Sequence, residues 1–381
     1  MAKKKEKAGK VLTNDAISKK YKGCGLASTV AVMPDDAIWI PSRYIELNYT
    51  TGGGIPYGKI LELFGEESSG KSLLAIDYAV VTQKLGGIVL WADAEHAFDA
   101  RWAIANGLDL DRIMVYPETA VENLSDWSAD MAVTCRSRLT DNEPILMVTD
   151  SLAALDCLAN IDSVQADAKA EMGNRAKAIY KWLRIRNELY SDLGITSIYI
   201  NQLRKKVGAG MFEDPDTTPG GGAMKFYASI RVGVYGGKQI KEKVNGFEDR
   251  VGRMVSVRIK KNKVAPPRPT IKAKMFNNAE YCTPGFSKYE GLPDLLVKLG
   301  VIFKKKGSSV YKDADDNKLA TGEKNMIKLL TKNSKLRASL IKEAGINTVS
   351  QTRKQLSKIT ENRYPVTIKK IKSQNDEDDD E

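Results

Sequence analysis

The sequence predicts an α/β protein built on a mainly parallel twisted sheet flanked by helices. Apolar runs that suit buried parallel strands alternate with helical segments from residue 59 to residue 202, which is the pattern of repeated β-α-β units. A glycine-rich loop at residues 65–72 follows the first of these strands and precedes the first helix. Ligands of such sheets bind beyond the carboxyl ends of the strands, so the functional site is expected at that edge.

Four parts of the 381-residue chain differ in composition. Residues 1–33 form a basic N-terminal arm, expected either to pack on a neighbouring subunit or to be disordered, and residues 34–284 form the α/β core. Residues 285–363 are rich in lysine and are expected to form a small basic α+β domain. Residues 364–381 are a tail that ends in an acidic run, which is expected to be solvated.

The hydrophobic periodicity predicts the elements of the core in order. Strands are predicted at residues 59–64, 88–92, 113–116, 145–150 and 196–201. Helices are predicted between them at residues 73–84, 99–106, 121–139 and 175–193. The stretch before the loop, from residue 34, is expected to form short strands and turns. Because each strand is followed by a helix, consecutive strands are expected to run parallel.

The chain changes character after residue 202. Residues 203–222 are rich in glycine and have no core-forming pattern, which inside a compact domain indicates a functional or disordered loop. Three strands are then predicted as an antiparallel continuation of the sheet, at residues 230–235, 254–260 and 269–275. Two helices are predicted in the C-terminal domain, at residues 288–299 and 324–344.

Composition limits the class of protein. The chain is 42% hydrophobic and 28% charged, which is ordinary for a protein that buries a large core. Its net charge of +11 favours an anionic partner, nucleic acid first, although a merely basic surface accounts for the charge equally well. Four scattered cysteines without paired spacing argue against a zinc site and a disulfide framework. No apolar run of membrane-spanning length and no secretory signal are visible.

The glycine-rich loop fits the pattern G-x-x-x-x-G-K-[ST] of loops that cradle phosphate groups. Its residues are Gly65, Glu66, Glu67, Ser68, Ser69, Gly70, Lys71 and Ser72. The two glycines let backbone N–H groups point at a phosphate, and the start of the following helix adds partial positive charge. Lys71 is expected to reach the β- and γ-phosphates of a bound nucleotide, and Ser72 to hold Mg²⁺.

Two carboxylates follow strands of the same sheet. Asp150 ends an apolar strand later in the chain than the loop, the position of the second Mg²⁺-organising group of a nucleotide hydrolase. Glu95 follows the strand after the loop helix, where a carboxylate can orient or deprotonate the water that attacks the γ-phosphate. One pocket is expected to collect the loop, Glu95, Asp150 and Gln202, because all lie at strand ends. The single histidine, His96, is assigned no catalytic role.

Six segments of the core occur in an order that resembles the RecA family of bacterial homologous recombinases. They are residues 67–72 (ESSGKS), 93–97 (DAEHA), 148–155 (VTDSLAAL), 201–204 (NQLR), 220–229 (GGGAMKFYAS) and 261–266 (KNKVAP). The resemblance covers about residues 54–267. Two positions of the loop depart from the family: Glu66 replaces its usual proline, and Ser72 replaces the commoner threonine, which is a conservative change for Mg²⁺.

The resemblance implies further roles around ATP. Asp99 and Trp102 fall where the family contacts the adenine ring. Gln202 falls where the family senses the γ-phosphate and passes that state to the loop that follows. Lys261 and Lys263, which by themselves form only a basic turn, would reach the ATP of a neighbouring subunit.

The resemblance also implies DNA contacts and a subunit interface. Residues 203–222 resemble the second DNA-binding loop of the family, and residues 172–173 match the end of the first. The implied DNA-binding residues are Met172, Gly173, Arg184, Arg204, Met211 and Phe212. Phe226 and Arg231 fall on subunit-interface positions, together with the two lysines.

The leading functional hypothesis is ATP-dependent strand exchange in homologous DNA recombination and DNA repair. The protein would polymerise into a helical filament on single-stranded DNA, pair it with homologous double-stranded DNA and exchange the strands, with DNA-stimulated ATP hydrolysis. A single-strand-binding protein or a loader is a candidate accessory partner, and no membrane partner is expected. The expected location is cytoplasmic, in a bacterial nucleoid or in a phage-infected host.

Two other hypotheses stay open. A ring-forming helicase on a related core would carry a separate partner-binding domain and usually an arginine in place of Lys261 and Lys263, and the sequence shows neither. A scaffold that coats single strands under ATP control, with little turnover, would need neither Glu95 nor Gln202. The absence of the helicase features and the presence of Glu95 and Gln202 therefore favour the recombinase hypothesis.

Overall fold

The computed structural model describes residues 38–162, 168–205, 216–220, 222–266, 268, 270–278 and 280–358. These residues belong to one compact unit that begins at Ile38. The predicted N-terminal arm and acidic tail lie outside the described residues, as do Met211 and Phe212. No helix within the described ranges is long and apolar enough to cross a membrane.

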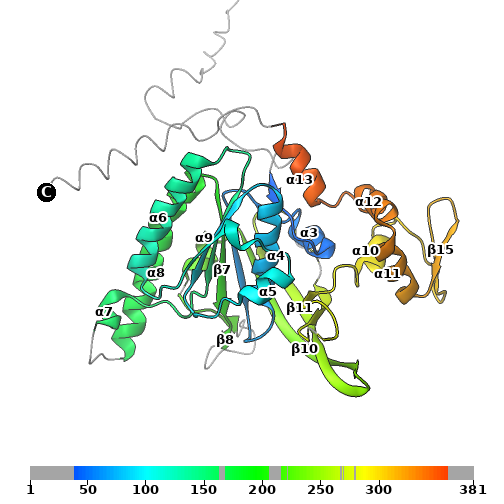
Figure 1. The fold of residues 1–381 in the computed structure, drawn as a ribbon, viewed down its shortest axis with the longest axis horizontal. Coiled ribbons are helices and arrows are strands. Elements are labelled where there is room, and N and C mark those ends of the chain that lie inside the picture. The colour runs from blue at the N-terminus through cyan, green and yellow to red at the C-terminus, as the bar shows by residue number, and fades with distance from the viewer. Residues whose placement is uncertain are drawn as a thin grey trace, which may run out of the picture. The chain divides into compact units, whose positions relative to one another are not determined.

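A nine-stranded sheet forms the centre of the described part of the chain (Figure 1). Its strand order is β13-β12-β11-β10-β3-β7-β6-β4-β5. The strands are β3 (Ile60–Gly65), β4 (Ile88–Asp93), β5 (Ile113–Tyr116), β6 (Ile145–Asp150), β7 (Ile195–Gln202), β10 (Ile230–Val244), β11 (Phe247–Asn262), β12 (Ile271–Phe276) and β13 (Gly285–Phe286). The pairs from β10 through β3, β7, β6 and β4 to β5 are parallel, and the pairs on the other side of β10 are antiparallel. The predicted mainly parallel sheet with an antiparallel continuation is confirmed.

Helices cover both faces of the parallel strands, which explains their continuous apolar sequences. The main covering helices are α4 (Lys71–Lys84), α5 (Ala100–Ala105), α6 (Val121–Arg138) and α8 (Ala168–Asp192). Successive side chains of a strand point to opposite faces. Leu61 and Leu63 of β3 therefore pack in the cluster that contains α4, whereas Ile60 packs with Ile179 and Leu183 of α8. The predicted strands and helices of this region are confirmed to within a few residues, except that α8 begins seven residues before its predicted start.

One helix occurs where only short strands and turns were predicted. The strands are present as β1 (Trp39–Ile40) and β2 (Ile55–Pro56), but α3 (Ile45–Thr51) lies between them. Its sequence contains β-branched and aromatic residues with low helix propensity, and seven residues are too few for a helix that is stable alone. Burial of Ile45 and Leu47 stabilises it, so tertiary packing outweighs local propensity.

The antiparallel hairpin is longer than predicted. β10 and β11 run past the rest of the sheet (Figure 1) and join at Asn245 and Gly246, which have φ values of 51° and 90°. Positive φ at both positions is the geometry of a type I′ turn, for which Asn-Gly is the preferred sequence. The prediction ended the first strand at residue 235 although this turn signal was present.

The C-terminal part contains more elements than predicted. They are α10 (Leu292–Lys298), β14 (Val310–Lys312), β15 (Lys318–Thr321), α11 (Glu323–Lys332), α12 (Ser334–Glu343) and α13 (Val349–Leu356). The single helix predicted at residues 324–344 is wrong, because Asn333 separates two helices. Its side chain accepts a hydrogen bond from the backbone N–H of Leu336 at 3.0 Å and so caps α12. A separate apolar cluster that includes Leu292, Tyr311 and Met326 fills this part.

Candidate active site

A cavity of about 340 Å³ lies at the carboxyl ends of the parallel strands. The predicted site residues that line it are Glu67, Ser68, Ser69, Gly70, Lys71, Ser72, Glu95, Asp99, Trp102, Asp150 and Gln202. Gly65 and Glu66 begin the loop but are not among the lining residues. The loop, Glu95, Asp150 and Gln202 therefore meet in one pocket, as strand order and strand ends predicted.

The glycine-rich loop has a backbone that only glycine suits at two positions. Gly70 precedes α4 with φ 99°, and a Cβ there would lie 2.6 Å from the sulfur of Met275. A Cβ at Gly65 would lie 2.0 Å from the carbonyl oxygen of Val234 on β10. The loop is thus pressed against the antiparallel side of the sheet, and larger residues would displace it.

Lys71 points back along the loop. Its Nζ donates hydrogen bonds to the carbonyl oxygens of Gly65 at 3.2 Å and Glu66 at 2.6 Å. Burial lowers the pKa of Lys71, and the nearby Asp150 and Glu95 carboxylates act in the opposite direction. A buried ammonium group at this position can form charge-assisted hydrogen bonds with an anion such as a phosphate chain.

Asp150 and Ser72 offer two oxygen atoms next to each other. The Ser72 side chain makes a hydrogen bond with the Asp150 carboxylate. Burial raises the pKa of Asp150 to about 6, and the charges of Glu95 and Asp93 act in the same direction. A hydroxyl and a carboxylate are ligands that Mg²⁺ prefers, and a cation at this position would offset the crowding of negative charge.

Glu95 is oriented by groups from two neighbouring strands. Its Oε1 accepts a hydrogen bond from the hydroxyl of Ser151, which follows β6. The same oxygen accepts a hydrogen bond from Nε2 of Gln202 at 3.3 Å, and the backbone N–H of Glu95 donates to the Asp150 carbonyl at 3.1 Å. The carboxylate of Glu95 is therefore tied to the end of β7.

Asp99 and Trp102, at the start of α5, also line the pocket. Asp99 caps α5, because its Oδ1 accepts hydrogen bonds from the backbone N–H groups of Arg101 at 2.8 Å and Trp102 at 3.2 Å. The bond from Trp102 is the main cause of the lowered pKa of Asp99. Trp102 is half-buried and packs against the core cluster while it lines the cavity.

Several residues of the pocket were not predicted from the sequence. Met275 and Asn277 line it from the antiparallel side of the sheet, and Arg253 of β11 donates from Nη1 to the carbonyl oxygen of Ser68 at 3.2 Å. Arg253 is 185 residues from Ser68. No local sequence signal marks such residues, since only the pairing of β10, β11 and β12 brings them to the loop.

Lys261 and Lys263 lie away from this pocket. Arg231 of β10 pairs with Glu62 of β3 and with Lys261 of β11, whereas the loop begins at the other end of β3. The Nζ atoms of Lys261 and Lys263 each lie 3.3 Å from the carbonyl oxygen of Phe226 and donate to it. We call these two lysines and Phe226 the lysine edge.

The other predicted interface and DNA-binding residues also lie outside the pocket. Arg231 forms an ion pair with buried Glu62 and is itself largely buried, with its guanidinium 5.0 Å from the centre of the Phe64 ring. Gly173 and Arg184 are exposed on α8, and the backbone of Met172 is part of the same helix. Arg204 is exposed in β8 (Arg204–Lys205), which pairs with β9 (Asp216–Thr217).

The fold and the pocket together define a nucleotide hydrolase with a phosphate-binding loop. A family model described as the RecA N-terminal domain matches residues 14–280. The chain is 38% identical over 303 residues to "Protein RecA" of Bacteroides thetaiotaomicron, covering 77% of this chain and 84% of the relative. It is 37% identical over 309 residues to "Protein RecA" of Rhodococcus opacus, covering 80% and 81%.

The chain therefore belongs to the RecA family. Members of this family are DNA-dependent ATPases that act in homologous recombination and repair by strand exchange. This assignment decides against the ring helicase and the passive scaffold.

Proposed function

We propose that the pocket binds ATP with Mg²⁺ and hydrolyses it when the chain is assembled on single-stranded DNA. The observation that carries this proposal is the hydrogen bond between Gln202 and Glu95 inside the cavity. It links the carboxylate best placed to act on water with the strand that leads into residues 203–222. The loop and Lys71 would hold the phosphates of ATP.

The residues present fit Mg²⁺ as the cofactor. Ser72 and Asp150 would hold it, since their oxygens are adjacent and the Asp150 carboxylate is partly buried beside other negative groups. When bound, Mg²⁺ would neutralise part of the charge on the phosphates. Lys71 would stabilise the remaining negative charge at the β- and γ-phosphates.

Glu95 would accept a proton from the attacking water, with Ser151 and Gln202 fixing its orientation. A second contact supports coupling between hydrolysis and DNA. The backbone N–H of Leu203 donates to the carbonyl of Gly65 at 2.9 Å, so the start of residues 203–222 is attached to the phosphate-binding loop. A change at the γ-phosphate would reach the proposed DNA-binding residues Arg204, Met211 and Phe212 by this route.

The lysine edge would complete the site of a neighbouring subunit in a helical filament. Its position at the end of β3 opposite the loop supports action on another chain's ATP rather than on its own. Phe226 is 71% exposed, which suits a subunit contact, and Arg231 would support that face from beneath. The N-terminal arm at residues 1–33 is proposed to contact the neighbouring subunit, and Met172, Gly173 and Arg184 to contact DNA.

The proposed partners are single-stranded DNA and homologous duplex DNA, with a single-strand-binding protein or a loader as accessory factors. The basic domain at residues 285–363 would gather duplex DNA, and the acidic tail would compete with DNA for its lysines. DNA as substrate and the cysteine usage support a cytoplasmic location, in a nucleoid or in a phage-infected host.

The test is ATP hydrolysis with and without single-stranded DNA, measured on the wild type and on Lys71→Ala. Strong stimulation by DNA that is lost in the variant is expected, because Lys71 would contact the phosphates directly. Hydrolysis that is indifferent to DNA would mean that residues 203–222 are not coupled to the pocket, and the proposal would fail.

A further inference from the structure

A buried carboxylate in α4 takes no part in the proposed chemistry. Asp77 lies six residues after Lys71 and is completely buried. Its carboxylate accepts hydrogen bonds from the Ser42 hydroxyl at 2.6 Å and the backbone N–H of Arg43 at 3.0 Å, and it pairs with Nε of Arg43. A charge in such a place is costly unless it is paired and hydrogen-bonded, and here the hydrogen bonds and the ion pair come from residues 42–43.

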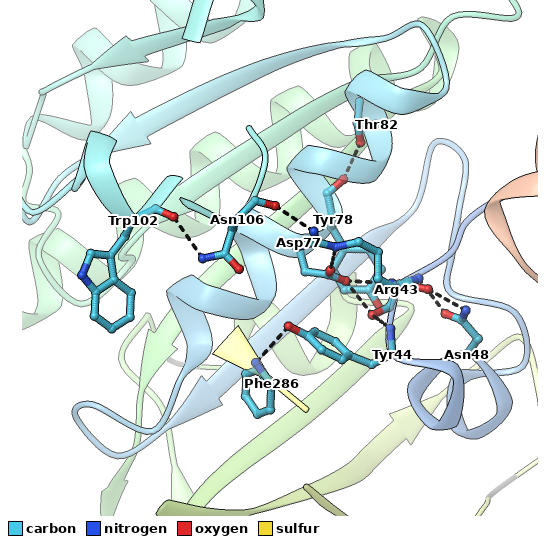
Figure 2. A network of polar contacts seen from close by, with 10 residues as sticks. Arg43, Tyr44, Asn48, Asp77, Tyr78, Thr82, Trp102, Asn106 and Phe286 are labelled. Carbon is cyan, nitrogen blue, oxygen red and sulfur yellow. Dashed lines mark hydrogen bonds and ion pairs between the residues drawn. The ribbon is translucent and has the colours of Figure 1, made fainter. Parts of the chain in front are cut away.

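The guanidinium of Arg43 makes a second contact (Figure 2). While Nε pairs with Asp77, Nη1 donates to the carbonyl oxygen of Asn106 at 2.7 Å. The Asn106 side chain in turn donates from Nδ2 to the carbonyl oxygen of Trp102 at 3.0 Å, and the indole ring points away from this network. A chain of hydrogen bonds thus runs from the loop helix to Trp102, which lines the cavity.

The helix that carries Trp102 depends on such anchors. α5 has six residues, and only Ala103 among them is buried. A helix of this length is not stable by itself, so contacts at its two ends set its position. Asp99 caps its start, and Asn106 follows its last residue. Beyond that end, Gln83 of α4 bonds both backbone groups of Asp109, at 2.7 and 2.8 Å.

A second arm of the same network leads to the loop instead. The backbone N–H of Tyr44 donates to the Ser42 hydroxyl at 3.0 Å, and the Tyr44 hydroxyl accepts from the backbone N–H of Phe286 at 3.0 Å. The Phe286 ring lies behind Gly70, where an added Cβ would come within 2.9 Å of it. This arm leads to the phosphate-binding loop and not to α5. A variant of this arm can therefore be compared with a variant of the arm through Asn106.

We propose that the pair of Asp77 and Arg43 is a positioning element for the base of the nucleotide. It fixes the position of the end of α5, so that the indole of Trp102 is held in place to contact the base. The inference rests on the proposed function, because it takes the pocket to bind ATP, and it takes the base to lie beside Trp102, where the resemblance to the RecA family would place it. Neither Asp77 nor Arg43 lines the cavity, so both act through Asn106.

The test compares two ligands, ATP and inorganic tripolyphosphate, which carries the phosphate chain without a base. The variant is Arg43→Lys, which keeps a positive charge beside Asp77 but cannot hold two acceptors in a rigid fork. We expect its affinity for ATP to fall about threefold to tenfold, and its affinity for tripolyphosphate to stay unchanged. Both are measured by calorimetry on the full chain with Mg²⁺ and without DNA.

Two control variants sharpen this result. Tyr44→Phe removes the hydroxyl of the other arm and is expected to leave the ratio of the two affinities unchanged. Arg136→Lys makes the same substitution at a buried arginine of α6, which donates to the carbonyl oxygens of Leu193 and Thr140 at 2.9 and 2.8 Å. It should also leave the ratio unchanged.

Equal weakening of both ligands by Arg43→Lys would show a general structural role and overturn the inference, as would full affinity for ATP. If wild-type protein bound tripolyphosphate as tightly as ATP, the base contact itself would be lost, and the inference with it. If the wild type prefers ATP and Arg43→Lys keeps that preference, only the inference fails. Asp77→Asn, which removes the charge that pairs with Arg43 but keeps an oxygen acceptor for Ser42, gives the same test should Arg43→Lys not fold.

Discussion

The two ends of β3 differ in whether the functional side chains already have their partners within one chain. At the carboxyl end, the pocket holds partnered groups: Lys71 contacts loop carbonyls, Glu95 accepts from two side chains, and Asp150 bonds Ser72. At the lysine edge, an exposed phenyl ring stands beside two lysines that donate to a backbone carbonyl. The pocket has the features of a binding site that one chain forms completely. The lysine edge has the features of an exposed surface that contacts another subunit.

This difference separates ATP binding from ATP hydrolysis. One chain supplies the groups proposed to hold the nucleotide, whereas the positive charge proposed to act on the developing negative charge comes from another chain. Binding should therefore occur in a free subunit, and hydrolysis should require assembly.

The largest effect is expected from the double variant Lys261→Ala/Lys263→Ala. DNA-stimulated hydrolysis should fall about 10³-fold, the scale of a cationic group supplied across a subunit boundary, while ATP binding stays intact. Steady-state hydrolysis and calorimetry measure the two quantities. Lys241→Ala/Lys243→Ala removes the same charge from the far part of β10 and serves as the control. A parallel loss of ATP binding would show that the lysines belong to their own chain's pocket.

Replacing Glu95 with glutamine should lower hydrolysis about 10²-fold, because the amide cannot accept the proton from water. ATP binding and filament assembly on DNA should be kept, as electron microscopy can show. Glu248→Gln, at an exposed carboxylate of the hairpin, is the matched control. Mixing Glu95→Gln with the double lysine variant should restore part of the activity, since intact pockets then meet intact lysines. No restoration would contradict action between chains.

A smaller effect is expected from Phe226→Ala. The protein concentration needed for filament assembly should rise about tenfold, because an exposed ring that is buried on assembly contributes to a subunit contact. Thermal stability of the free subunit should hardly change. Phe247→Ala removes a ring that is 79% exposed at the hairpin tip, and it should leave assembly unchanged. Light scattering against concentration distinguishes the two, and equal effects would argue against a specific interface at Phe226.

The smallest effect concerns pH. The pKa of Lys261 is lowered to about 8. Burial is the main cause, and the positive charge of Lys263 is the second. The ammonium is therefore present below pH 8 and is lost as pH rises through that value. DNA-stimulated hydrolysis should fall about threefold between pH 7.5 and pH 8.5 from this group. Lys261→Arg should flatten the profile, because a guanidinium stays charged. An unchanged slope in that variant would assign the alkaline loss to another group.

Much of the pocket followed from the sequence, for a physical reason. The spacing of Gly65, Gly70, Lys71 and Ser72 reflects what the local backbone needs in order to surround a phosphate. The motif can therefore be recognised from the sequence alone. Glu95, Asp150 and Gln202 lie at strand ends, and parallel strands with covering helices bring those ends to one edge. The meeting of these residues at that edge was predictable because each element is specified by its own residues.

Long-range pairing decided the rest. α3 forms because packing outweighs its low propensity, and Asn333 divides a predicted helix because its side chain caps the second half. Arg253 reaches the loop across 185 residues, and Arg43 reaches Asp77 across 34. Such contacts depend on which surfaces become buried against each other. The sequence by itself determined which groups are proposed to bind a nucleotide, and only the tertiary structure determined what holds them in place, because burial and pairing are properties of the folded chain.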